Sequence, residues 1–133
     1  MRISIMQPAF LPWLGYFQRI AQSDLHIILN HVPMDRSSKT RFTNRNKIRT
    51  HDGWAWLTVP VKTTRRSDAV PISKLEINNI DHWQRKHLKA IENNYSKAPY
   101  YPKYNELLDG IYSTKANDLN SLLLGSTSVL LDV

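Results

Sequence analysis

The sequence has no cysteine and no apolar run near the roughly 20 residues that a transmembrane helix needs. Without cysteine, the chain can form no disulfide and no thiolate metal site. The first apolar stretch begins at once and lacks the small-residue cleavage site of a secretory leader. These absences predict a cytoplasmic protein of bacterial type without membrane insertion.

Several signatures of catalysis and nucleotide binding are also missing. The sequence has neither the G-x-G-x-x-G of dinucleotide folds nor the G-x-x-x-x-G-K-[ST] of phosphate loops. It has no G-x-S-x-G elbow, and its five histidines lack the H-x-x-x-H spacing of metal sites. An enzyme with this sequence is therefore expected to position and polarise its substrate with His, Tyr, Asn and Arg. No metal ligand is predicted, and the cofactor is left open.

The net charge of +7 is unevenly distributed along the 133 residues. Residues 36–66 carry nine basic residues and one acidic residue, whereas the segments on either side are nearly neutral. This concentration predicts a positive surface patch and a phosphate-bearing or otherwise anionic partner. The alternative is a basic loop that only keeps the protein soluble.

The N-terminal pattern predicts a parallel βαβ unit. An apolar strand over residues 2–6 is followed by a helix that begins at Pro12 and by a second strand, Leu25 to Asn30. The second strand is almost continuously apolar, which is typical of a strand buried on both faces. Residues 31–50 have no clear period and are interpreted as a long, irregular, functional loop.

The second half of the sequence predicts strands and then helices. Strands are expected at residues 54–61 and 72–77, and helices are expected to start at Asp81 with a capping box to Gln84, at Pro102, and at Asn117 or Asp118. The predicted fold is α/β, with a mainly parallel sheet started by the N-terminal βαβ unit and a helical C-terminal half. We expect residues 1–133 to be a single α/β domain, truncated at its apolar C-terminus, which favours an oligomer.

Two groups of polar residues suggest a substrate-binding site. Gln7 and Tyr16 flank the junction of the first strand and helix, where backbone N–H groups favour an anion. Asn44, Arg45 and Asn46 combine a guanidinium that can clamp a phosphate with two amides that donate and accept hydrogen bonds. Taken alone, each group is also explained by a turn without a ligand.

His87 lies on the apolar stripe of the helix that starts at Asp81, together with Tyr95. A buried, neutral imidazole with a hydrogen-bond partner is the more frequent explanation for such a histidine. General acid–base catalysis is the alternative.

A series of motifs, in this order, carries a resemblance to a known family: Gln7-Pro8, Pro12-Trp13, Gly15-Tyr16-Phe17, Asp24, Asn44-Arg45-Asn46, Leu57-Thr58-Val59-Pro60, Trp83, His87, Tyr95 and Ala98-Pro99-Tyr100. The chain resembles the WbqC-like family, found among bacterial genes for O-antigen and other surface polysaccharides. The resemblance covers nearly the whole sequence. It implies a role in building glycans such as lipopolysaccharide, whose precursors are nucleotide-activated or lipid-diphosphate-linked sugars.

The resemblance gives the matched polar residues weight as one site. The expected enzyme is a transferase that acts on a phosphate-bearing small molecule such as a nucleotide-sugar. The resemblance implies substrate binding by Gln7, Tyr16, Asn44, Arg45 and Asn46, and catalysis by His87 and Tyr95. In this hypothesis Arg45 and the N-terminus of the first helix hold phosphate, and His87 is the general acid or base.

One departure from the family keeps two alternatives open. Family members usually have Asp-Asp-Val-Gln where this chain has Asn30-His31-Val32-Pro33. If the acidic pair is needed for activity, the protein is a non-catalytic scaffold in a glycan-assembly complex. A nucleic-acid-binding module is the other alternative, because residues 36–66 interleave basic residues with Phe42, Trp54 and Trp56.

Overall fold

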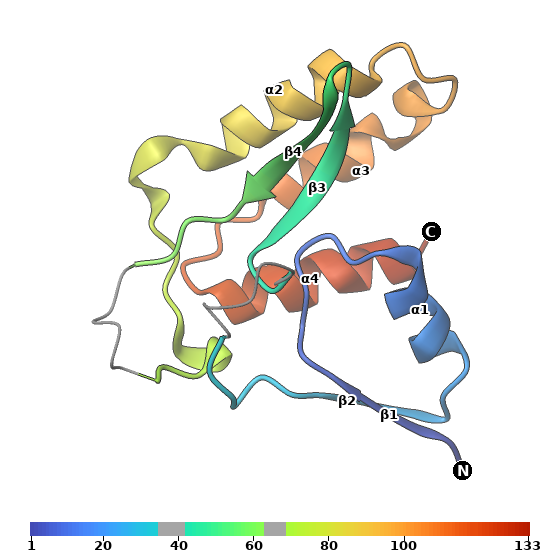
Figure 1. The fold of residues 1–133 in the computed structure, drawn as a ribbon, viewed down its shortest axis with the longest axis vertical. Coiled ribbons are helices and arrows are strands. Elements are labelled where there is room, and N and C mark those ends of the chain that lie inside the picture. Colours follow the sequence, from blue (N-terminus) through green and yellow to red (C-terminus); the bar gives the residue numbers. More distant parts are fainter. Residues whose placement is uncertain (35–41, 63–68) are drawn as a thin grey trace.

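The computed structural model describes residues 1–34, 42–62 and 69–133 (Figure 1). Its elements are the strands β1 (Ile3–Met6), β2 (Leu25–Ile28), β3 (Arg45–Thr50) and β4 (Gly53–Thr58), the helices α1 (Leu14–Ala21), α2 (Trp83–Tyr95), α3 (Tyr101–Ser113) and α4 (Leu119–Leu131), and the 3₁₀ turns η1 (Ile72–Lys74) and η2 (Asn79–Asp81). The predicted mixed α/β composition and helical C-terminal half are confirmed.

The strands form two separate pairs. β1 and β2 are parallel and connected through α1, which confirms the predicted βαβ unit. β3 and β4 are antiparallel, because a turn of two residues can only return the chain alongside itself. The described residues therefore do not form the expected mainly parallel sheet. Residues 31–50 are likewise not one irregular loop, since their last part is β3.

The parallel pair is covered on one side only. Ser4 and His26 are neighbours on one face, where the Ser4 hydroxyl lies 2.7 Å from His26 Nδ1. On the other face, Ile5 is 57% and Leu25 47% exposed. The expectation that the second strand is buried on both faces was wrong, because such burial needs a layer of structure on each side of the sheet.

Three local expectations also need correction. Residues 72–77 begin with η1 rather than forming a strand, and Ile77 makes only an isolated bridge to Val61. The predicted capping box at Asp81 is replaced by His82 at the N-cap of α2, with a left-handed φ of 47° and no side-chain cap. α1 begins at Leu14, slightly after the predicted start.

The last two helices begin as predicted. α3 has a proline in its first turn, and the Asp118 side chain caps α4 by accepting a hydrogen bond of 2.8 Å from Ser121 N. Both signals are local, so they hold whatever packs around the helices.

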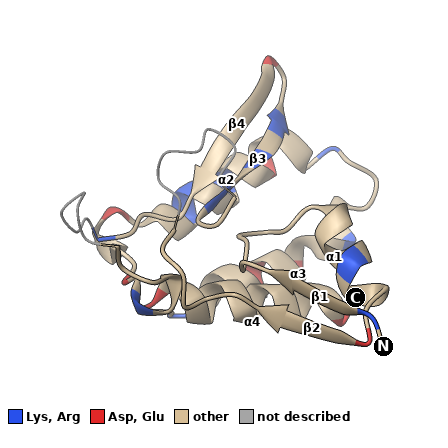
Figure 2. Cartoon of the chain, turned by 60° about the horizontal axis from the view of Figure 1, so that its bottom comes forward, with Lys and Arg blue, Asp and Glu red and all other residues tan. Residues whose placement is uncertain are grey.

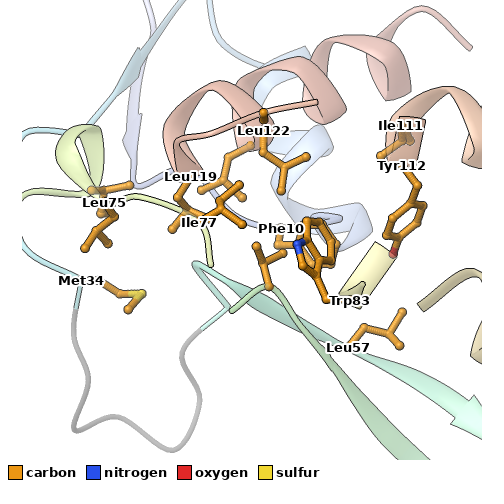
Figure 3. Close-up of a cluster of buried hydrophobic side chains, with 14 of the residues drawn as sticks. Phe10, Met34, Leu57, Leu75, Ile77, Trp83, Ile111, Tyr112, Leu119 and Leu122 are labelled. Atoms are coloured by element: carbon orange, nitrogen blue, oxygen red, sulfur yellow. The ribbon is translucent and has the colours of Figure 1, made fainter. Parts of the chain in front are cut away.

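The hydrophobic core lies between the β3–β4 hairpin and helices α2 to α4 (Figures 1 and 3). Phe10 is fully buried and packs edge-on against Trp83 and Tyr112. Its backbone N–H donates to Phe42 O at 3.0 Å. The segment after β1 is therefore part of the core, and it joins the N-terminal unit to the helical half.

Candidate functional site

A pocket of about 400 Å³ lies between β3 and the junction of α2 and α3. It is lined by Leu11, Asn46, Lys47, Ile48, Leu57, Ile91, Tyr95, Ala98, Tyr100, Tyr101, Tyr104 and Leu108. Its volume is within the range of about 300–1,000 Å³ that is typical of small-molecule sites. We take this pocket as the centre of the candidate site.

Asn46 and Tyr95 are the two predicted site residues that line the pocket. Asn46 Nδ2 donates to Leu11 O, and Asn46 Oδ1 accepts from Lys47 N at 2.7 Å. The Tyr95 hydroxyl accepts from Arg49 N at 2.9 Å. Both side chains therefore hold the pocket wall together.

Leu11 shows what Asn46 stabilises. Its φ of 45° is in the left-handed region, which is costly for a bulky residue. The hydrogen bond from Asn46 to the Leu11 carbonyl stabilises this left-handed conformation and offsets part of its conformational free energy. A polar residue of β3 thus fixes the backbone of a second segment that lines the pocket.

Arg45 contributes to a second surface, which we call the hairpin face and define as Arg45, Lys47, Trp54 and Trp56. The Arg45 guanidinium lies 3.9 Å from the Trp56 ring centroid, and Lys47 Nζ lies 3.8 Å from that of Trp54. Trp54 is 57% exposed. Figure 2 shows basic residues along this hairpin and acidic colour at its turn, where Asp52 lies. The hairpin face offers positive charge beside an exposed aromatic ring.

Lys47 connects the pocket with the hairpin face. It lines the pocket, yet its ammonium group lies among the tryptophan rings. A ligand that occupies the pocket and extends past the edge of β3 would therefore meet this cation.

His87 is buried among aromatic rings. It is 6% exposed, its Nε2 lies 3.1 Å from Thr58 O, and its Nδ1 lies 3.3 Å from the Tyr112 hydroxyl. Burial lowers the pKa of His87 to about 4, although the hydrogen bond to Thr58 O acts in the opposite direction. The imidazole is therefore neutral at pH 7, with Nε2–H donating to Thr58 O and Nδ1 accepting from Tyr112.

This environment has a consequence for the predicted catalytic role of His87. Both ring nitrogens are engaged, and the residue lies eight positions before Tyr95 on α2, or about 12 Å along the helix axis. Proton transfer to a substrate would require one of these hydrogen bonds to be exchanged. The role of His87 as a general acid or base stays a prediction.

Gln7 and Tyr16 belong to the N-terminal unit, away from the pocket. Gln7 is half-buried directly after β1. Tyr16 is 2% exposed and packs against the rings of Trp13 and His26, and this burial raises the pKa of its hydroxyl. Aromatic contacts from Trp13 to Phe42 and onward to Trp56 connect Tyr16 to the hairpin face.

Asn44 is buried at the base of the hairpin. Its Nδ2 donates to Val59 O at 2.9 Å, and Val59 N donates to Asn44 O at 2.7 Å. Within the described part of the chain, Asn44 Oδ1 has no hydrogen-bond partner. The three consecutive polar residues thus point to three places: Asn44 into the interior, Arg45 to the hairpin face and Asn46 to the pocket.

The tyrosines of the α2–α3 junction are not among the site residues predicted from the sequence. Tyr100, Tyr101 and Tyr104 line the pocket with Tyr95. A signal was available, because four tyrosines within ten residues around a proline-rich break is an unusual density. The basic residues predicted at 36–41 and 63–66 lie outside the described residues.

Metal clusters and membrane-spanning helices can be assessed for residues 1–34, 42–62 and 69–133, which the structure describes. Among them, no group of three or more His, Asp or Glu residues is arranged to hold a metal ion. No helix formed by these residues is long and apolar enough to cross a bilayer.

The comparisons with known proteins bear on the whole chain. The sequence model of the WbqC-like protein family matches residues 7–133. The chain belongs to the WbqC-like protein family. A relative from Mycobacterium tuberculosis strain ATCC 25618 / H37Rv, the uncharacterized protein Rv1507c, is 34% identical over 122 residues.

This match covers 92% of the WbqC-like chain but 51% of the relative, so the chain spans about half the length of the curated relative it matches. No solved structure matches the chain. The family resemblance stated from the motifs is confirmed, and its chemistry has to be argued from the site.

Proposed function

We propose that this WbqC-like protein is a group-transfer enzyme of bacterial surface-polysaccharide biosynthesis that acts on a phosphate-bearing or nucleotide-linked sugar. The observation that supports this proposal is the position of Lys47. It lines a ligand-sized pocket, and its ammonium group lies on the hairpin face together with the guanidinium of Arg45. Cations beside a pocket favour a substrate whose phosphate lies at the edge of the pocket.

In this proposal the hairpin face binds the phosphates. Arg45 and Lys47 neutralise them, and the exposed ring of Trp54 stacks on a nucleobase, which is typically worth about 1–3 kcal/mol. Asn46 and Tyr95 fix the pocket wall, and Tyr95 touches the substrate. In the transfer the acceptor hydroxyl oxygen forms the new bond, the bond to the phosphate leaving group breaks, and His87 takes the hydroxyl proton at Nδ1 after giving up its hydrogen bond from Tyr112.

A transfer assay tests the proposal. The protein is incubated with a panel of nucleotide sugars and candidate acceptors, and the products are detected by mass spectrometry. We expect Arg45→Ala to weaken binding of the nucleotide sugar, and His87→Gln to abolish turnover while leaving binding intact. Arg85→Ala is the matched control, because it removes an exposed guanidinium from α2 outside the site. Unchanged turnover in His87→Gln would remove His87 from the mechanism.

A second candidate function is binding of single-stranded nucleic acid. The hairpin face supports it, since exposed Trp54 lies beneath Lys47 and next to Trp56, with Arg45 close by. Affinity for a short oligonucleotide is then expected to fall steeply with salt and to fall further in Trp54→Ala. Absence of binding at low salt would exclude this function. Tight binding to a companion enzyme, with no small-molecule ligand, would instead favour the scaffold.

A further inference from the structure

The pocket wall is almost wholly apolar or aromatic. Apart from the four tyrosines, its polar residues are Asn46 and Lys47. Both polar ends of the Asn46 amide are used within the protein, and the Tyr95 hydroxyl already accepts from Arg49 N. The hydroxyls of Tyr100, Tyr101 and Tyr104 are then the groups left on an otherwise apolar wall to hydrogen-bond a ligand.

A pocket whose other lining is mostly leucine, isoleucine and alanine favours a hydrocarbon over a sugar ring. A hydroxyl that leaves water without a new hydrogen bond costs about 1–3 kcal/mol, and a sugar carries several. A hydrocarbon chain has the opposite preference, because each methylene gains free energy on leaving water. The pocket thus favours the hydrocarbon part of a ligand.

Charge at the pocket is divided between its two ends. At the β3 end lies Lys47, with its ammonium on the hairpin face. At the α3 end, Lys103 Nζ lies 5.1 Å from the Tyr104 ring centroid, but the pKa of Tyr101 is raised by desolvation and then by the carboxylates of Glu92 and Asp109. An anionic group is therefore better placed at the β3 end.

We propose that the pocket binds the hydrocarbon chain of an alkyl or prenyl phosphate, with the chain among the tyrosines and the phosphate at the β3 end near Lys47. This names a substrate class for the site of the proposed function. The reaction of this ligand rests on the proposed function, whereas its binding rests on the lining of the pocket.

Chain length provides the first test. Inorganic phosphate and butyl, hexyl and octyl phosphate are titrated into the full chain by isothermal calorimetry, at concentrations where each is monomeric. Affinity is expected to rise by about fourfold per methylene until the pocket is filled. Equal affinity across the series would overturn the proposal. So would binding of anionic vesicles without binding of any monomer, because the ligand would then be a membrane surface.

A pocket-filling variant provides the second test. Ala98→Phe adds a ring at the pocket wall, whereas Ser96→Phe adds the same ring at an exposed neighbour that does not line the pocket. We expect Ala98→Phe to weaken octyl phosphate binding at least tenfold and Ser96→Phe to leave it unchanged, with thermal melts showing that both variants are folded. Equal affinities in the two variants would place the chain elsewhere. If Ala98→Phe does not fold, Ala98→Ile is used, because isoleucine is larger than alanine but smaller than phenylalanine. Ser96→Ile is then the control.

These results are distinguishable from failure of the proposed function. Octyl phosphate binding without transfer from any nucleotide sugar would keep the pocket assignment and contradict the group-transfer enzyme. Transfer that proceeds normally in Ala98→Phe would contradict the pocket assignment and keep the enzyme.

Discussion

The buried imidazole of His87 makes the stability of this protein depend on pH. Its pKa is about 4 in the folded chain and about 6.5 in an unfolded chain. At about 1.4 kcal/mol per pKa unit, this difference corresponds to at most about 3 kcal/mol. Between these two values the unfolded chain binds a proton that the folded chain does not, so stability falls as the pH falls. The contribution is complete above about pH 6.5 and lost by about pH 4.

His87→Gln removes this titration. Urea unfolding of the protein with His87 and of the His87→Gln variant is measured at pH 4, 5, 6, 7 and 8. At each pH, the free energy of unfolding of the variant is subtracted from that of the protein with His87. All shared carboxylates cancel in the difference, although the uncharged replacement side chain adds a constant offset. We expect the difference to decrease by up to about 3 kcal/mol from pH 7 to pH 4. A difference that does not vary with pH would refute a neutral, buried His87.

Three further predictions concern the stability of the fold, and each is measured by urea unfolding. Removing the α4 cap in Asp118→Ala should cost about 1 kcal/mol, and no loss would show that the cap is dispensable. Asn46→Ala should cost about 1–3 kcal/mol, since the Leu11 carbonyl loses its partner, whereas exposed Asn93→Ala should cost little. Ile72→Ala should cost about 2–5 kcal/mol in the core. Ile5→Ala, on the open face of β1, should cost much less, and equal losses would mean that this face is covered.

The elements predicted correctly are those with strong local signals. The proline at the start of α3 and Asp118 at the start of α4 act through neighbouring backbone groups, so no tertiary information is needed. The βαβ unit follows from two apolar strands on either side of a short amphipathic helix. The aromatic and β-branched pattern after Gly53 likewise indicated β4.

The sequence of β3 predicts a loop because it is almost entirely polar. Its residues read Arg-Asn-Lys-Ile-Arg-Thr, with Ile48 the one aliphatic side chain. The strand forms because it pairs along its whole length with β4, and the charged groups of Arg45 and Lys47 lie over tryptophan rings. Such cross-strand packing cannot be recognised within one segment of sequence.

The candidate site was only partly predictable for a similar reason. The sequence places Asn44, Arg45 and Asn46 in one group, but alternation along the strand sends neighbouring side chains to opposite faces. The pocket itself depends on β3 meeting the α2–α3 junction, about 50 residues later in the chain. A histidine on an apolar stripe did indicate a buried, hydrogen-bonded imidazole, and His87 is one.

The most direct test of the central claim is a thermal-shift screen against nucleotides and nucleotide sugars, because a ligand bound only by the folded protein raises the unfolding midpoint. The proposed enzyme should be stabilised by at least one nucleotide sugar, and the shift should disappear in Arg45→Ala but persist in Arg85→Ala. Absence of a shift with every compound, or the same shift in Arg45→Ala, would contradict a phosphate-bearing sugar bound at the hairpin face.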